Sequence, residues 1–231
     1  MTENTLPVFP KSSFDFMGQL QSNNNREWFA LNKEVYQDEK QKVEFFLDEL
    51  LNDLNKHDVI ETPSARKSLY RVYRDIRFSK DKTPFCPGWL GRFKRATKYR
   101  RGGYYYHFEP GHSFVIGGFW GPSAQDLKLV RDDIAFDATP LRNILQSQSF
   151  KSTFGTLQGD KLKTTPKGYP ADHEAIDLLR YKQYLIIRRF TDEEVLSRDF
   201  FMVVSQALKN MRPFFDYMSE VLTVDVNGLP L

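Results

Sequence analysis

Charged and titratable side chains gather in two short stretches of the sequence, YRVYRDIRFSKDK at 70–82 and HFEPGH at 107–112. In the first stretch, arginine and lysine alternate with tyrosine, phenylalanine and branched apolar residues. Guanidinium groups carry paired donors that match the oxygens of a phosphate or a carboxylate. In the second stretch, His107 and Glu109 are two residues apart, so on a β-strand their side chains would share one face. Such a pair could serve a bound molecule as acid and base.

The period-two pattern at 69–78 predicts a β-strand with two unlike faces. Val72 and Ile76 would face the core, whereas Arg71, Asp75 and Arg77 would point outward or into a cleft. If this strand lies beside the one that carries His107 and Glu109, we expect these side chains to converge. Cross-strand ion pairs on a solvated face are the simpler explanation of the same pattern and remain the alternative.

These observations give a set of predicted site residues. The predicted catalytic residues are His107, Glu109 and Asp75. The predicted ligand-binding residues are the cations of the first stretch, Arg71, Arg74, Arg77, Lys80 and Lys82.

His107, Glu109 and His112 flank one tight turn, where their side chains form a candidate metal site. Two histidines and a carboxylate can bind zinc or iron. The direction of a turn residue such as His112 does not follow from the sequence, and the paired cysteines of a zinc deaminase are absent. We therefore expect no metal and no cofactor. Cys86 has no predicted helix start or base beside it, and we do not expect it to act as a nucleophile.

Positive charge is concentrated in one segment, although the net charge of the chain is only +3. Residues 66–101 hold 13 Lys or Arg and two acidic residues, so this segment carries +11 and the remainder carries −8. The segment either projects a positive face or neutralises acidic elements packed against it. A positive face interleaved with aromatic residues would suit single-stranded nucleic acid. A nucleic-acid-binding accessory protein and a partner-docking domain are therefore the alternatives to a small-molecule pocket.

Composition indicates a folded, soluble protein. The 231 residues include 20 Phe, 11 Tyr and one Cys, which argues for a filled aromatic core and a reducing compartment. The amino terminus lacks the pattern of a secretory signal, and no apolar run is long enough to span a membrane. We expect a cytoplasmic protein without a membrane partner.

The periodicity predicts helices at both ends of the domain and strands in the middle. Helices are expected at about 12–20, 26–56 and 192–221, with shorter ones between 123 and 180. The clearest strand signal is a hairpin, GGYYYHFEPGHSFVIGGF, centred on Pro110 and Gly111. Further strands are expected in WLGRFKRA and YLIIRRF. The fold class is therefore α+β, with a mainly antiparallel sheet packed against long N- and C-terminal helices.

The same pattern predicts the domain organisation. We expect a flexible tail at 1–11, a single domain at 12–222 and a C-terminal tail at 223–231.

Five blocks of the sequence resemble a bacterial and fungal protein family, domain of unknown function 2461. In order, the blocks are NNNREWF, YRVYRDIRFSKDKTP, GYYYHFEPG, PKGYPADHEAIDLL and DEEVLSRDF. The resemblance spans about 14–215 and implies one full-length domain, with no established activity. Family members often continue after Pro84 with an aromatic residue and Lys-Thr, whereas this chain has Phe85, Cys86 and Pro87. Cys86 cannot supply the charge of that lysine.

Overall fold

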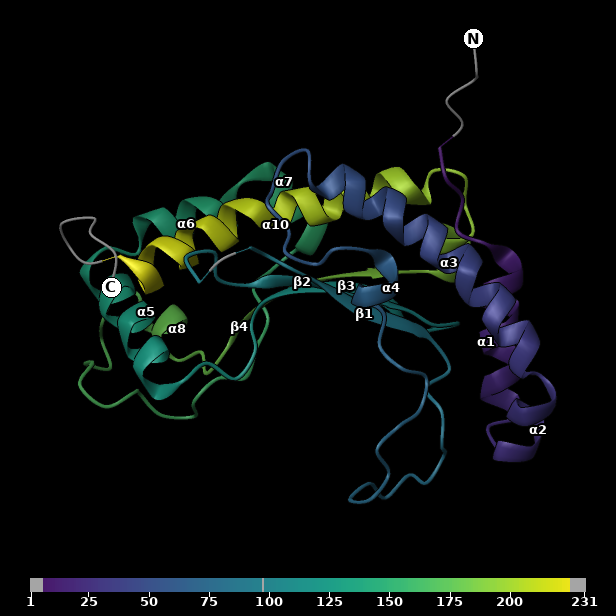
Figure 1. Cartoon of the computed structure of the whole chain (residues 1–231). Helices are drawn as coiled ribbons and strands as arrows, with labels where there is room; N and C mark the ends of the chain where they lie inside the picture. The colour runs from purple at the N-terminus through teal and green to yellow at the C-terminus, as the bar shows by residue number, and fades with distance from the viewer. Residues whose placement is uncertain (1–5, 97, 225–231) are drawn as a thin grey trace, which may run out of the picture. The chain divides into compact units, whose positions relative to one another are not determined.

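The aromatic hairpin predicted near Pro110 is present and forms the two inner strands of a sheet. In this computed structural model, which describes residues 6–96 and 98–224, β2 is Gly103–Phe108 and β3 is Ser113–Phe119. The outer strands are β1 (Trp89–Lys94) and β4 (Tyr184–Phe190), and the order across the sheet is β1-β2-β3-β4 (Figure 1). The sheet is antiparallel and lies in the middle of the sequence. The predicted α+β class is confirmed.

Helices precede and follow the strands. The helices before the sheet are α1 (Lys11–Ser22), α2 (Arg26–Leu31), α3 (Lys33–Leu54) and α4 (Ala65–Ser68). Those between β3 and β4 are α5 (Ala124–Phe136), α6 (Thr139–Gln146), α7 (Gln148–Phe154) and α8 (Ile176–Leu179). The last two are α9 (Asp192–Val195) and α10 (Phe200–Thr223). None of the helices in the described part of the chain is long and apolar enough to cross a membrane.

The described chain divides into two compact units. Unit 1 comprises residues up to 93 together with 105–115 and 189–206, and unit 2 comprises 94–104, 116–188 and the residues from 207 onward. The predicted single domain at 12–222 stays a prediction. Of the two predicted tails, residues 1–5 and 225–231 lie outside the described residues.

The core of unit 1 is built from aromatic rings on one face of β2. Phe108 lies 5.2 Å from Phe9 and 5.3 Å from Phe200 between ring centroids, in edge-on geometry. Phe46 of α3 stacks on Phe200, the first residue of α10, at 5.9 Å. Edge-on and offset aromatic pairs stabilise a fold beyond the area that they bury. These contacts hold α3 and the start of α10 against the same face of β2.

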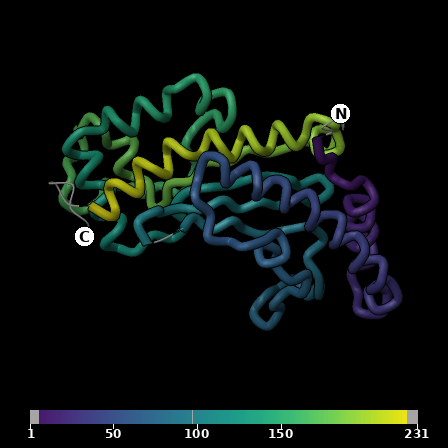
Figure 2. Tube along the Cα trace, turned by 45° about the horizontal axis from the view of Figure 1, so that its top comes forward, coloured from purple at the N-terminus to yellow at the C-terminus, as the bar shows by residue number. Residues whose placement is uncertain are grey.

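The prediction of a β-strand at 69–78 is wrong. Figures 1 and 2 show a long loop between α4 and β1 that extends away from the strands. Within this loop, only isolated β-bridges form, Leu69 to Gly91 and Tyr73 to Phe85. The side chains of Asp75 and Asp81 accept hydrogen bonds from the backbone N–H groups of Arg77 and Thr83. Asp favours such local turns over a strand ladder. The alternation of residue types therefore did not produce a strand.

The two longest predicted helices are each divided. The helix predicted at 26–56 breaks at Asn32, whose side-chain amide donates to the Trp28 carbonyl at 2.8 Å. The helix predicted at 192–221 becomes α9 and α10, and α10 continues through Pro213. The apolar face of α3 lies in the core, where Val43, Phe46, Leu47, Leu50, Leu51 and Leu54 are all buried.

Two glycines of unit 1 give a paired test of this packing. A Cβ at Gly91 of β1 would lie 2.2 Å from the Tyr106 hydroxyl oxygen and 2.4 Å from the Ser68 carbonyl oxygen. Gly91→Ala should therefore lower the free energy of unfolding by about 1–3 kcal/mol. Gly18 of α1 has only Pro110 nearby, at 3.9 Å, so Gly18→Ala should raise it by roughly 0.5–1 kcal/mol. Urea unfolding measures both, and a neutral Gly91→Ala would contradict this packing.

Candidate functional site

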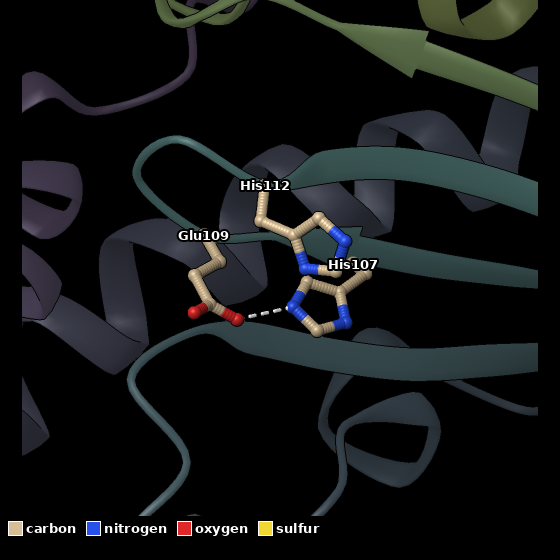
Figure 3. Close-up of side chains that lie close together, drawn as sticks. All are labelled: His107, Glu109 and His112. Atoms are coloured by element: carbon tan, nitrogen blue, oxygen red, sulfur yellow. Dashed lines mark hydrogen bonds and ion pairs between the residues drawn. The ribbon is translucent and has the colours of Figure 1, made fainter. Parts of the chain in front are cut away.

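His107 and Glu109 lie together at the end of β2, as predicted. His107 Nε2 is 2.5 Å from Glu109 Oε2, and the two side chains are 11% and 15% exposed (Figure 3). A hydrogen bond therefore joins the imidazole to the carboxylate. The period of two that buries Tyr106 and Phe108 in the core places Tyr105 and His107 on the opposite face.

The turn after β2 is held by several hydrogen bonds. The His112 N–H donates to the Glu109 carbonyl at 2.9 Å, and Ser113 Oγ binds both the N–H and the carbonyl of Glu109. Gly111 adopts a φ of +77°, which favours glycine, and its N–H donates to Asp192 Oδ1 at 2.8 Å. The backbone on both sides of Glu109 is therefore fixed.

Aromatic rings surround the imidazole of His107. Phe114 of β3 stacks on it at 4.8 Å between centroids with a 22° angle, and His112 packs edge-on at 5.4 Å. The Tyr105 hydroxyl lies 3.4 Å from His107 Nδ1. Burial raises the pKa of the Tyr105 hydroxyl well above its usual range, so this hydroxyl stays protonated beside the imidazole.

His112 completes a cluster that we call the hairpin triad: His107, Glu109 and His112. One ligating atom from each of the three side chains lies within 4.8 Å of the others. Figure 3 shows the three side chains pointing toward one another from the β2–β3 hairpin.

Asp75, the third predicted catalytic residue, belongs to a different place. Arg77 forms a two-point ion pair with it, Nε to Oδ1 at 2.9 Å and Nη2 to Oδ2 at 2.6 Å. Both side chains are exposed in the 69–88 loop. The structure thus pairs Asp75 with Arg77 rather than with the hairpin triad.

Arg74 is fixed inside the same loop. Its Nη1 binds Asp81 Oδ2 at 2.5 Å and also the side chain and carbonyl of Thr83. Asp81 in turn accepts from the N–H and the hydroxyl of Thr83, both at 2.9 Å. Arg74, Asp81 and Thr83 therefore form a closed network that orders the loop.

Two hollows in unit 1 are lined in part by residues of this loop, and Tyr73 lines both. The first, the Arg71 groove, has a volume of about 560 Å³ and is lined by Tyr70, Arg71, Tyr73, Cys86, Gly88 and the leucines 69 and 90. The second, the Arg26 hollow, has a volume of about 380 Å³, and its cationic lining residues are Arg26, Lys33 and Arg74. The predicted ligand residues Arg77, Lys80 and Lys82 line neither.

Comparison with known proteins identifies the chain at the level of a family. Residues 12–217 match the model of the family described as conserved hypothetical protein (DUF2461). The chain belongs to this family. No curated protein and no solved structure matches the chain. The predicted resemblance is confirmed, and DUF2461 membership brings no activity with it.

Part of the positive charge of the basic segment, residues 66–101 of this DUF2461 protein, is neutralised by ion pairs within unit 2. Arg95 is buried, with Nη2 at 2.6 Å from Asp216 Oδ1 and Nη1 at 2.9 Å from the Arg101 carbonyl. Arg101 Nη2 lies 2.5 Å from Asp126 Oδ2. Two of the arginines expected on an open nucleic-acid face thus neutralise acidic helices instead.

Three residues that lie at these sites were not predicted from the sequence: Tyr105, Arg26 and Lys33. A signal existed for the first, since Tyr105 has the same strand parity as His107. Arg26 and Lys33 join the loop only in the folded chain, because they precede Arg74 by 48 and 41 residues in sequence. Cys86 lines the Arg71 groove, where burial and the charge of Glu109 raise the pKa of its thiol.

The loop network has a measurable pH signature. The Thr83 N–H, Arg74 and the Thr83 hydroxyl together lower the pKa of the Asp81 carboxyl from 3.8 to about 2. The stabilisation of the loop should therefore be complete above pH 3.8 and be lost as the pH falls through about 2. Carbon-detected NMR titration should show this low midpoint, and Arg74→Gln should move it upward. A wild-type midpoint near 3.8 would mean that the loop is not ordered in this way.

Proposed function

We propose that this protein binds a small molecule with a phosphate or carboxylate group in the Arg26 hollow. The observation that carries the proposal is the gathering of Arg26, Lys33 and Arg74 around one concave surface. Neither Arg26 nor Lys33 has an ion-pair partner among the residues that the structure describes. Cations that face one hollow without acidic partners repel each other, and an anion between them relieves that repulsion.

The position of Lys33 supports a functional rather than a structural role. Lys33 is the first residue of α3, a helix of 22 residues. The positive end of the helix dipole disfavours a cation there, by about 0.3–1 kcal/mol at an exposed site. Helix stability therefore does not account for a lysine at this position, whereas anion binding does.

Aromatic rings line the hollow between the cations. Phe29 and Phe85 stack at 4.2 Å between centroids, with a 23° angle, and Tyr73 packs against both. Phe29 and Phe85 are buried, whereas Tyr73 is 53% exposed and offers a free ring surface. A cationic rim with an apolar lining suits a molecule that has an anionic group and an apolar or planar body.

Arg74 is held in place before any ligand arrives. Asp81 and Thr83 engage its Nη1, and no other nitrogen of this guanidinium has a described partner. Guanidinium carries five N–H donors, so several remain for a ligand. A preordered donor loses little side-chain entropy on binding.

The enzymatic use of His107 and Glu109 stays a separate prediction, because the Arg26 hollow and the hairpin triad share no lining residue. Binding alone is the function that the hollow supports. Arg71 lines the neighbouring groove and not the Arg26 hollow. The two hollows share one lining residue, Tyr73.

Charge-removing variants test the proposal. A panel of inorganic phosphate, nucleotides, sugar phosphates and dicarboxylates is screened by isothermal titration calorimetry at fixed ionic strength. For the strongest ligand, Arg26→Gln and Lys33→Gln should each weaken binding about 10- to 100-fold, since a hydrogen bond to a charged group contributes roughly 1.5–3 kcal/mol. Lys80→Gln is the matched control, because it removes the same charge from the loop outside the hollow and should leave affinity unchanged.

Two results would contradict the proposal. One is a panel in which no small anion binds. The other is equal weakening by Lys80→Gln and Lys33→Gln, which indicates a diffuse charge effect. Binding of every oligonucleotide with an affinity that falls steeply as salt rises would favour the nucleic-acid alternative instead.

A further inference from the structure

We infer that His107, Glu109 and His112 form a binding site for one divalent transition-metal ion, with zinc as the reference ion. The three donors come from six consecutive residues of the β2–β3 hairpin, and their ligating atoms lie within 4.8 Å of one another (Figure 3). The site is distinct from the Arg26 hollow and does not depend on it.

The donor set fits this class of ion. Neutral imidazole nitrogen suits zinc, iron, copper and nickel, and one carboxylate supplies a negative charge. Three protein ligands leave at least one coordination position open, as in catalytic rather than structural zinc sites. Magnesium and calcium prefer oxygen ligands, so two histidines argue against them.

The side chains of His107 and Glu109 lie slightly closer together than two ligands of one metal ion. Ligands at about 2.0–2.2 Å from zinc lie roughly 3–3.5 Å apart. His107 Nε2 and Glu109 Oε2 are 2.5 Å apart, which is hydrogen-bonding distance. Metal binding therefore needs these two atoms to separate by about 1 Å. The Glu109 side chain can supply this movement by rotation, because its backbone is already held by Ser113.

The surroundings orient the ligands as they do around known metals. A metal-bound histidine usually makes a hydrogen bond through its other ring nitrogen. Tyr105 Oη is 3.4 Å from His107 Nδ1, so it can accept from Nδ1–H once Nε2 binds the ion. Phe114 stacks on His107 and also contacts His112, with centroids 5.3 Å apart, which restrains both rings.

The Arg71 groove lies close to this site, although no residue of the hairpin triad lines it. Gly88 lines the groove, and a Cβ placed on it would lie 2.9 Å from the Cβ of Glu109. Tyr70 also lines the groove, and its ring centroid is 6.0 Å from that of Tyr105. The groove therefore runs beside the residues that hold the ion, with Arg71 as its cationic group.

Direct metal-binding measurements on the full chain test the inference. Protein stripped with a chelator is titrated with Zn²⁺ by calorimetry, and with Co²⁺ by visible absorption, which reports the coordination. We expect one ion per chain. His112→Gln, at an exposed position, should weaken binding more than about 100-fold, since changes outside the ligand shell alone cost 10- to 100-fold. Tyr105→Phe should weaken it within that smaller range.

Matched variants separate this site from others. His173→Gln makes the same chemical change outside the triad and should leave metal binding unchanged. Arg26→Gln should also leave it unchanged, so failure of the anion proposal does not affect this result. If wild type binds no ion, or binds it as well after His112→Gln as after His173→Gln, the inference is wrong. Circular dichroism of each variant establishes that it is folded.

Discussion

The packing of Phe108 among Phe9, Phe46 and Phe200 determines where the polar chemistry of this protein lies. These rings fix which face of β2 turns to the helices. Side chains alternate along a strand, so burial of Tyr106 and Phe108 leaves Tyr105 and His107 on the other face. A slip of one residue would place the imidazole in the aromatic core and expose the phenylalanine. The hydrophobic contact therefore sets the position of the polar site.

The hairpin was predictable from sequence because its information is local. Period-two aromatic residues and a Pro-Gly turn lie within one stretch, and the neighbours of His107 follow from the pleat. The helical character of α3 was predictable for the same reason. Helix breaks were not, because the Asn32 side chain competes with the backbone over a single turn. The predictions of the hairpin and of α3 succeeded because each pattern extends over several turns or residue pairs.

The loop at 69–88 defeated prediction for a physical reason. Its alternation of charged and apolar residues is typical of a strand, but two aspartates bind backbone N–H groups inside the segment. Arg77, which was expected to converge on His107, instead pairs with Asp75, and Arg74 pairs with Asp81, both close in sequence. Arg95 and Arg101 likewise pair with acids of distant helices. A count of cations along a sequence does not show which of them remain available after folding.

Because all three residues of the hairpin triad come from one short hairpin, they can bind an ion even in the unfolded chain. His107, Glu109 and His112 are separated by so few residues that an unfolded or partly folded chain keeps all three donors near one another. Closing so short a loop takes on the order of 10–100 ns and little entropy. An ion that binds these donors would therefore also bind the denatured ensemble, and its effect on the folding equilibrium would be smaller than its affinity for the native state implies. Sites assembled from distant segments, such as the Arg26 hollow, lack this residual binding and couple more strongly to folding.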